Sequence, residues 1–437
     1  MKIALVNPPY RITKEHVTNY AKNSLRRAQP VLSLAILATE LKQLGHEILY
    51  LDSVIEGIDQ THHFDEYTDY YGLSIEQIKE RINSFGADQV WMTCLCTALF
   101  PLAEKIAQSL EQPVIIGGNH ASLNVKEISQ NDTFYSIVCG EADNQIENIF
   151  RKMEHKKIIH LPRLENMDTA IQVDWSLLPL MDYWEKALPQ NPFAKSRKTI
   201  LYETSRGCPE RCIFCSTTKF FGNKFRPKSS QFVVDEITAA VRKYNIEEVQ
   251  FTDDSMGVNA QRFMEICDGL KPLKIHLCNP SGIRLYTKDE NQIKEIFQKM
   301  KDAGFYQFTF AVESGNERVL NKLIRKRLDL KFTEKLISMA KEYFKVHVFL
   351  IMGLPGETMN EMQDTIDLAR RIKADSYSIS LAQPFPKTDL EQLCKDSNYI
   401  IDGIQEYDML LGRQTIKRDD NLDIEKLVQD LLIELNN

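Results

Sequence analysis

The sequence predicts an α/β fold, in which a doubly wound, flavodoxin-like or Rossmann-like domain is followed by a partial (β/α)6 barrel. Three observations support this prediction. Short apolar runs alternate with amphipathic helical segments along most of the 437 residues. The alternation is interrupted once, by a proline-rich stretch at residues 156–198. The chain is also too long for one ordinary hydrophobic core, so we expect more than one domain.

The first domain is expected to span residues 1–155 and to contain five strands. Their sequences are "KIALVN" (2–7), "HEILYLD" (46–52), "DQVWMTCL" (88–95), "PVIIGG" (113–118) and "YSIVCG" (135–140). Helical segments separate them, such as "PVLSLAILATELKQLG" (30–45), which has Pro at its start and Gly at its end. Strands connected through helices pair in parallel, so both faces of the sheet are covered. Ligands of such sheets bind at the carboxyl ends of the strands.

The second domain follows the proline-rich stretch, which we interpret as a linker covering residues 156–198. Six further strands are expected, each followed by a helical segment, at residues 200–205, 247–253, 274–279, 306–314, 345–353 and 376–385. Six consecutive βα units predict a partial barrel over residues 199–389, with its chemistry at the carboxyl ends of the strands. Residues 390–437 are expected to form a mostly helical C-terminal extension.

Composition excludes several functional classes. The net charge is −7, whereas a nucleic-acid-binding surface needs a basic excess. No apolar stretch is long enough to span a bilayer, and the amino terminus lacks the features of a signal peptide. We therefore expect a cytoplasmic protein with a small-molecule substrate and no membrane partner. In that compartment the nine cysteines stay reduced, so a cysteine cluster indicates metal binding or catalysis.

Three of these cysteines lie in "RGCPERCIFCS" (206–216), directly after the first barrel strand. Cys208, Cys212 and Cys215 are the predicted metal ligands. Three thiolates suit an iron–sulfur cluster, whereas a structural zinc site uses four ligands, commonly in two pairs. No second CxxC is present. Three ligands on a four-iron cluster would leave one iron open for chemistry. The alternative is that these are three incidental buried cysteines.

The CxxxCxxC spacing, with an aromatic residue before the last cysteine and βα units behind it, resembles the radical SAM superfamily. This resemblance implies a [4Fe-4S] cluster that reduces S-adenosylmethionine (SAM) to give a 5′-deoxyadenosyl radical, and an electron donor such as flavodoxin or ferredoxin. The later stretches "FTDDS", "VESGN" and "MGLPGET" resemble SAM-contacting motifs, although an acidic pair replaces the commoner Gly-Gly-Glu in the first. The implied SAM-binding residues are Phe214, Asp253, Asp254, Glu313, Ser314, Gly353 and Gly356.

The front domain resembles the cobalamin-binding domain that precedes many radical SAM modules. The stretches "NPPY", "IIGGNHAS" and "CGEADN" carry this resemblance. The implied cobalamin-binding residues are Asn7, Pro8, Thr93, Leu95, Thr97, Gly117, Gly118, His120, Ala121, Gly140 and Glu141. The Asp-x-His-x-x-Gly motif, whose histidine binds cobalt from below, is absent from the sequence. We therefore expect cobalamin bound without a histidine below its cobalt.

Together the resemblances imply a cobalamin-dependent radical SAM enzyme, with methylation of an unactivated carbon or a phosphinate phosphorus as the favoured reaction and natural product biosynthesis as its setting. Three alternatives remain open. The first is a cobalamin-dependent rearrangement or cyclisation without methyl transfer, and the second is a radical SAM enzyme whose front domain binds no cobalamin. The third is an iron–sulfur electron-transfer or scaffold protein, which would leave the SAM-like motifs unexplained. No catalytic residue acting on substrate is assigned.

Overall fold

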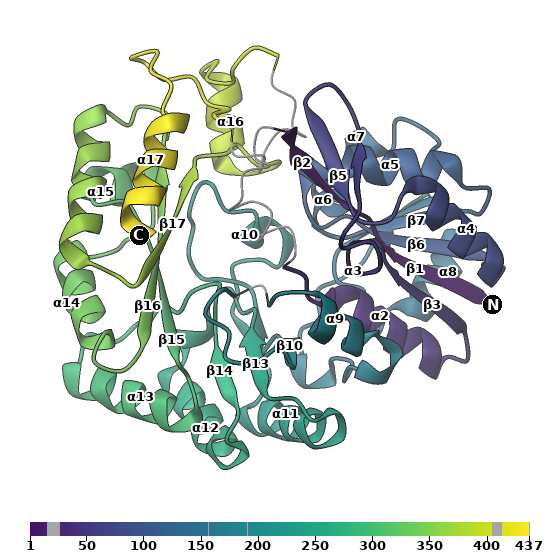
Figure 1. The fold of residues 1–437 in the computed structure, drawn as a ribbon, viewed down its shortest axis with the longest axis horizontal. Helices are drawn as coiled ribbons and strands as arrows, with labels where there is room; N and C mark the ends of the chain where they lie inside the picture. The colour runs from purple at the N-terminus through teal and green to yellow at the C-terminus, as the bar shows by residue number, and fades with distance from the viewer. Residues whose placement is uncertain (15–26, 156, 190, 404–412, 437) are drawn as a thin grey trace. The chain divides into compact units, whose positions relative to one another are not determined.

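A computed structural model describes residues 1–14, 27–155, 157–189, 191–403 and 413–436 of the chain (Figure 1). The chain forms two compact units. The first consists of Met1–Leu201 with Lys243–Asn245, and the second of Tyr202–Arg242 with Ile246–Asn437. The residues expected to form a linker are therefore counted with the first unit. In the described part of the chain, no helix has both the length and the apolar character needed to cross a membrane.

The first unit is built on one six-stranded parallel sheet. Its strands are, in spatial order, β3 (Glu47–Asp52), β1 (Lys2–Asn7), β6 (Gln89–Thr93), β7 (Val114–Gly117), β8 (Ser136–Cys139) and β9 (Ile158–His160). Every neighbouring pair is parallel. The strand order reverses beside β1, which is the signature of a flavodoxin-like doubly wound sheet. The predicted fold class is confirmed, and β9 adds a sixth strand from within the stretch expected to be a linker.

Helices connect these strands and bury their apolar faces. They are α2 (Leu32–Gln43), α3 (Ser53–Glu56), α4 (Ile75–Phe85), α5 (Phe100–Ser109), α6 (Asn119–Leu123), α7 (Val125–Ile128), α8 (Ile146–Met153) and α9 (Leu180–Lys186). Local signals fix their ends. The α4 helix, for example, begins with a capping box between Ser74 and Gln77 and ends at Gly86 in the left-handed conformation.

A small antiparallel sheet was not predicted from the sequence. It pairs β2 (Tyr10–Thr13) with β5 (Thr68–Tyr71), and β5 with β4 (Thr61–His63). The rings of Tyr10 and Tyr71 stack across the first pair, 5.6 Å apart between centroids. These strands are three or four residues long, and strands this short give little periodic signal in a sequence.

The barrel has six strands in sequential order. They are β10 (Thr199–Tyr202), of which only Tyr202 is counted with the second unit, β13 (Glu248–Phe251), β14 (His276–Cys278), β15 (Gln307–Glu313), β16 (Lys345–Met352) and β17 (Ser376–Leu381). They form two three-stranded sheets, which adjoin at a parallel bridge between Leu277 and Phe305. The arrangement is the predicted partial (β/α)6 barrel. A two-residue hairpin, β11 (Ser205–Arg206) with β12 (Arg226–Pro227), follows the first strand.

Helices separate the barrel strands, and Figure 1 shows α12 to α15 along the outer side of β14 to β17. Their bounds are α10 (Thr217–Phe220), α11 (Ser230–Tyr244), α12 (Ala260–Leu270), α13 (Glu290–Ala303), α14 (Leu330–Ala340) and α15 (Met359–Ile372), with a π-helix at Val319–Ile324. The α13 helix buries residues spaced three and four apart, and its Phe297 ring lies 5.4 Å from that of Phe308.

The C-terminal extension is helical at its two ends. It contains α16 (Asp389–Asp396) and α17 (Glu425–Asn436), and α17 packs on β17. The described residues between these helices, 397–403 and 413–424, form turns and extended chain. The expected mostly helical extension also covers residues 404–412, which lie outside the described residues, so this expectation stays a prediction.

Candidate active site

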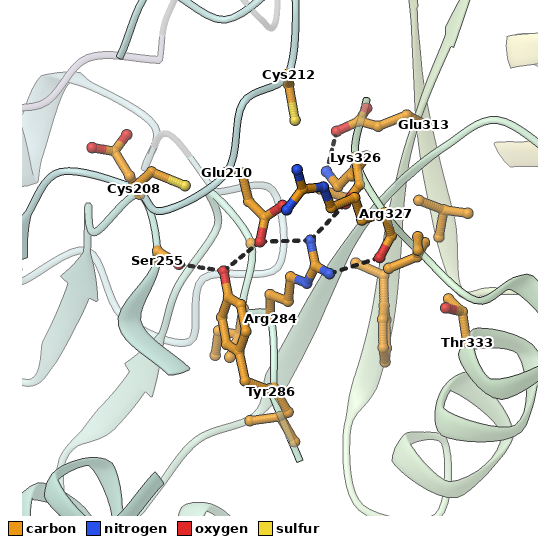
Figure 2. Close-up of a pocket in the computed structure, with 18 of the residues that line it drawn as sticks. Cys208, Glu210, Cys212, Ser255, Arg284, Tyr286, Glu313, Lys326, Arg327 and Thr333 are labelled. Carbon is orange, nitrogen blue, oxygen red and sulfur yellow. Dashed lines mark hydrogen bonds and ion pairs between the residues drawn. The ribbon is translucent and has the colours of Figure 1, made fainter. Parts of the chain in front are cut away.

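The three clustered cysteines lie on the loop between β11 and α10 and line one cavity of about 360 Å³ in the second unit (Figure 2). The turn into this loop requires glycine. Gly207 has φ of +84°, and a Cβ atom there would lie 2.3 Å from the carbonyl oxygen of Lys224. The local sequence thus folds so that Cys208, Cys212 and Cys215 face a common space.

Backbone bonds hold the middle of the cysteine loop in place. The Ile213 amide donates to the Ile324 carbonyl at 3.1 Å, at the end of the π-helix. On its other side, the Ile213 carbonyl accepts from the Leu390 amide at 2.9 Å, in the first turn of α16. The loop is therefore fixed between two segments that lie far from it in the sequence.

A carboxylate reinforces this arrangement. Asp389, the first residue of α16, accepts a hydrogen bond from Lys219 at 2.8 Å and another from Arg325 at 3.0 Å. Lys219 belongs to α10, directly after the cysteine loop, and Arg325 follows the π-helix. One residue of the C-terminal extension thus ties together both segments that flank the cysteines.

The chemistry of the thiols fits an iron–sulfur cluster. All three are free, and burial raises their pKa values, that of Cys212 to about 12 despite the nearby Lys326 ammonium. Cluster binding would therefore displace three protons. Among the described residues, no three Cys, His, Asp or Glu side chains are grouped around a single-ion site. Each cysteine of a four-iron cluster binds a different iron, so its thiolates stand farther apart than the ligands of one ion.

A buried ion pair lines the cavity near Cys212. The Lys326 ammonium and the Glu313 carboxylate are 2.6 Å apart, with side chains only 9% and 7% exposed. Burial alone would lower the pKa of Lys326, but the charge of Glu313 outweighs it and raises that pKa. Glu313 ends β15 with φ of 72°, a conformation that costs free energy in a non-glycine residue. Backbone strain of this kind is concentrated at functional sites.

The structure brings together three of the seven residues expected to bind SAM. Phe214, Asp254 and Glu313 line the cavity beside the cysteines, whereas Asp253, Ser314, Gly353 and Gly356 do not. Burial is the main cause that raises the pKa of Asp254 to about 7, and the charge of the neighbouring Glu203 raises it further. Its carboxylate also accepts a hydrogen bond from Thr217 at 3.1 Å.

Asp253 has a structural role in the barrel. It is completely buried and accepts hydrogen bonds from the amide and hydroxyl of Thr204, at 2.9 and 2.6 Å, and from the hydroxyl of Ser205. These bonds join the end of β13 to the segment that leads into the cysteine loop. Its contact with SAM remains a prediction.

The other predicted SAM-binding residues also make bonds within the protein. The Ser314 hydroxyl lies 3.1 Å from that of Thr365 and accepts the Asn316 amide. Gly353 and Gly356 have φ of 84° and 72°, and the buried Glu357 carboxylate accepts the Gly353 amide at 2.7 Å. Burial raises the pKa of Glu357 to about 7. The glycines are thus needed for the turn itself, whatever lies beside it.

Sequence reasoning did not single out Arg284, Tyr286, Lys326 or Arg327 as residues of the cavity. All four line it, and Figure 2 shows them with Glu210, which belongs to the cysteine loop itself. Glu210 accepts hydrogen bonds from Tyr286 and pairs with Arg284, both at 2.8 Å. Arg284 and Tyr286 belong to the segment "GIRLYT" (282–287), to which the sequence alone assigns no site residue. The other two follow a π-helix that no sequence signal predicts.

In the first unit, the residues expected to bind cobalamin all follow the carboxyl ends of parallel strands. Asn7 and Pro8 follow or end β1; Thr93, Leu95 and Thr97 end or follow β6; Gly117, Gly118, His120 and Ala121 end or follow β7; and Gly140 and Glu141 follow β8. These four strands are neighbours in the sheet. The predicted residues therefore share one edge, which is the ligand-binding edge of such folds.

Local contacts at this edge explain some of the residue types. A Cβ at Gly118 would lie 2.7 Å from the Cys94 carbonyl oxygen, so the turn needs glycine. His120 is buried, its Nδ1 atom lies 3.0 Å from the Asn124 amide group, and burial lowers its pKa to about 4. Asn7 donates to Asp52 at 3.0 Å. Its own Oδ1 atom is buried without a hydrogen-bond partner among the described residues.

The unpaired Asn7 Oδ1 atom allows us to ask whether the residues at this edge suit cobalamin. A buried amide oxygen without a donor costs about 1–3 kcal/mol, and a ligand with donor groups at this edge would relieve the cost. Cobalamin carries amide side chains around its corrin ring and supplies such donors. The residues present at the edge are therefore compatible with cobalamin.

Comparisons with known proteins identify both units. Residues 202–369 match the radical SAM superfamily, and residues 23–150 match the B12 binding domain. The chain is 28% identical, over 91% of its length, to the cytidylyl-2-hydroxyethylphosphonate methyltransferase of Streptomyces wedmorensis, of which 82% is covered. It is 23% identical, over 85% of its length, to the anaerobic magnesium-protoporphyrin IX monomethyl ester cyclase of Rubrivivax gelatinosus, of which 68% is covered.

Solved structures share the fold. The radical SAM methyltransferase TsrM from Kitasatospora setae, with cobalamin and a [4Fe-4S] cluster bound, aligns with a TM-score of 0.64 at 15% identity, over 92% of this chain and 76% of that one. The cobalamin-dependent SAM radical enzyme OxsB aligns with a TM-score of 0.61 at 17% identity. The match covers 91% of this chain but only 55% of the OxsB chain. The predicted family and cofactors are confirmed: the chain belongs to the cobalamin-dependent radical SAM enzymes, which use a [4Fe-4S] cluster, SAM and cobalamin.

Proposed function

We propose that this enzyme methylates an unactivated carbon, or a phosphinate phosphorus, of a small molecule. The observation that carries the proposal is the cavity in which Cys208, Cys212 and Cys215 face Phe214 and Glu313, in a chain that also has a B12-binding unit. A relative matched over 91% of the chain is named as a phosphonate methyltransferase, which supports methyl transfer. When bound, the cluster supplies the electron that cleaves SAM, and cobalamin carries the methyl group.

The roles of the chain's own residues follow from their places in the cavity. The three thiolates would hold the cluster, and Phe214, Asp254 and Glu313 would contact SAM. Lys326 pairs with the Glu313 carboxylate at 2.6 Å and holds it in position. Buried apolar residues of the cavity wall, among them Ile283, Phe310 and Val312, exclude water from the reacting groups. An external one-electron donor such as flavodoxin or ferredoxin would reduce the cluster in the cytoplasm, where thiols stay reduced.

The test measures the products of SAM without needing the substrate. The protein is reconstituted anaerobically with iron and sulfide, supplied with SAM and a strong reductant, and assayed with and without hydroxocobalamin. We expect S-adenosylhomocysteine only when corrinoid is present. The variant in which all three cysteines are changed to alanine should produce no 5′-deoxyadenosine. Corrinoid-loaded protein that forms no S-adenosylhomocysteine would contradict the proposal.

Radical cyclisation is the second candidate, because a relative matched over 85% of the chain is named as a cyclase. A cyclase would release 5′-deoxyadenosine without consuming the methyl group of SAM. The same assay therefore separates the two reactions, since only a methyltransferase accumulates S-adenosylhomocysteine.

A further inference from the structure

A buried carboxylate of the first unit connects the stretch expected to be a linker with the edge where cobalamin is expected to bind. Asp52 ends β3 and is 1% exposed, and it lies beside Asn7, the last residue of β1, in the parallel register. The Asn7 amide nitrogen donates to Asp52 Oδ1 at 3.0 Å. The hydroxyl of Tyr183, in α9, donates to Asp52 Oδ2 at 2.5 Å. One carboxylate thus links the linker stretch to a residue expected to bind cobalamin.

The Asp52 carboxylate is held in one orientation by its donors. The backbone amides of Val54 and Ile55 donate to Oδ1 at 2.9 and 3.4 Å, so the carboxylate also caps α3. Among the residues that the structure describes, Tyr183 is the only donor to Oδ2. Burial raises the pKa of Asp52, and the hydrogen bond from Tyr183 is the main contact that opposes this rise. Removing the Tyr183 hydroxyl would therefore leave Oδ2 unpaired and the carboxylate less firmly oriented.

The carboxylate decides which way the Asn7 amide faces. An ionised carboxylate only accepts hydrogen bonds, so the amide nitrogen of Asn7 must face Asp52 and its Oδ1 atom must face away. That Oδ1 atom is buried and has no donor among the described residues. Buried polar groups are almost always hydrogen-bonded, so an unpaired acceptor at the ligand-binding edge of the sheet indicates a donor that comes from a bound molecule.

We propose that Tyr183 and Asp52 are positioning residues of the cobalamin site: Tyr183 holds the Asp52 carboxylate, which turns the Asn7 acceptor toward an amide side chain of the corrin ring. An N–H group of that amide would supply the donor that Asn7 Oδ1 lacks. Asn7 is then the residue that contacts the cofactor, and the other two act through it. The inference goes beyond the proposed function, because it concerns corrinoid binding and holds for methyl transfer and cyclisation alike.

This arrangement should make the protein selective for an amide over an acid at one position of the corrin. Hydrolysis of the contacted amide replaces an N–H donor by a carboxylate, which only accepts hydrogen bonds. Two acceptors would then face each other at Asn7 Oδ1, and the affinity should fall about tenfold or more. A purely structural role of Tyr183 would not produce such selectivity, because a loosened fold weakens the binding of every corrinoid to the same extent.

The experiment measures binding of hydroxocobalamin, and of the set of its monocarboxylic acids in which each primary amide of the corrin is hydrolysed in turn. Equilibrium dialysis on the full chain gives the affinities, without SAM or reductant, so the outcome is independent of the proposed function. Tyr183→Phe removes only a hydroxyl. Asp52→Ser keeps a cap for α3 but is too short to hold Asn7. Asn7→Ala removes the acceptor itself, and circular dichroism checks that each variant is folded.

We expect the parent to bind cobalamin about tenfold or more tightly than one of the acids. Asn7→Ala should lose this preference, and Tyr183→Phe and Asp52→Ser should reduce it several-fold. The matched control is Tyr244→Phe, which removes another tyrosine hydroxyl of the first unit that donates to an aspartate, Asp174, at 2.6 Å. It should keep the preference of the parent.

Three results would overturn the inference. The first is a parent that binds no cobalamin or binds all the acids as tightly as cobalamin. The second is a preference that survives in Asn7→Ala. The third is a folded Tyr183→Phe or Asp52→Ser variant that keeps the preference of the parent or weakens every corrinoid equally, since that variant would show a structural role only.

Discussion

Changing Glu313 to glutamine should destabilise the second unit far more than the loss of one hydrogen bond would suggest. The substitution keeps the shape of the side chain but removes the negative charge 2.6 Å from the Lys326 ammonium. Both side chains are less than 10% exposed, so solvent screens the remaining charge poorly. Removing one partner of a buried ion pair leaves the other charge uncompensated, which costs about 3–5 kcal/mol. An exposed pair is worth at most about 1 kcal/mol.

The assay is urea unfolding of the full chain without cofactors, followed by circular dichroism. We expect Glu313→Gln to lower the free energy of unfolding by about 3–5 kcal/mol at pH 7. The matched control is Glu290→Gln, which breaks an exposed pair with Lys335 and should cost less than about 1 kcal/mol. Adding Lys326→Met to Glu313→Gln removes the stranded charge and should restore most of the lost stability.

The pH dependence provides a second measurement on the same variants. Without Glu313, burial lowers the pKa of Lys326, so the unfolded chain binds more protons than the folded one. Stability of Glu313→Gln should therefore rise between pH 7 and 9 relative to the parent. The reasoning is refuted if Glu313→Gln costs no more than the exposed control, or if the double variant is as unstable as the single one.

Four further predictions concern the cluster, the barrel, the corrinoid and the pH dependence. Replacing Cys208, Cys212 and Cys215 by alanine should abolish iron binding after anaerobic reconstitution; an iron content equal to the parent would disprove the ligand assignment. Asp253→Asn should lower the free energy of unfolding by about 1–3 kcal/mol and reduce the iron content, while the affinity for SAM per cluster stays constant. A selective loss of SAM affinity would instead show that this residue contacts SAM. Electron paramagnetic resonance of the cob(II)alamin-loaded protein should show no nitrogen hyperfine splitting from an axial imidazole or benzimidazole, and such splitting would refute a cobalt without a lower nitrogen ligand. Burial lowers the pKa of His347 to about 4, so the unfolded chain takes up a proton at a higher pH than the folded chain does. The free energy of unfolding should therefore fall by up to about 3 kcal/mol from pH 6.5 to 4. His347→Gln should flatten this pH dependence, and an unchanged slope would contradict the role of His347.

The sequence predicted the architecture well because apolar runs alternate regularly with amphipathic helical segments in both units. The parallel sheet, the six barrel strands and the position of the cysteine loop all follow from such local patterns. The pattern failed for short strands that lie outside the regular alternation of strands and helices. The strand β9 contributes only Ile158–His160 to the first sheet and lies in a proline-rich stretch, and β4 is equally brief.

Only those site residues that lie within recognisable sequence motifs could be predicted. Phe214 and Glu313 were identified through family patterns and line the cavity. Asp253 stands in a similar motif, yet its carboxylate is used by Thr204, a contact across strands that no local pattern encodes. Lys326 belongs to a basic cluster that the sequence favours as a solvated helix face, yet its ammonium is buried against Glu313. Such pairing is a property of the folded chain.

The dependence of the cysteine loop on α16 has a consequence for how the enzyme matures in the cell. Lys219 and Asp389 are 170 residues apart along the chain, and Ile213 also bonds to the residue after Asp389. At about 5–20 residues per second, the ribosome needs roughly 8 to 34 s to make the intervening segment. During that interval the thiols are already synthesised but lack the contacts that fix their loop. The cysteine loop therefore gains these fixing contacts only once Asp389 and Leu390 have been made, and products that end before Asp389 lack them.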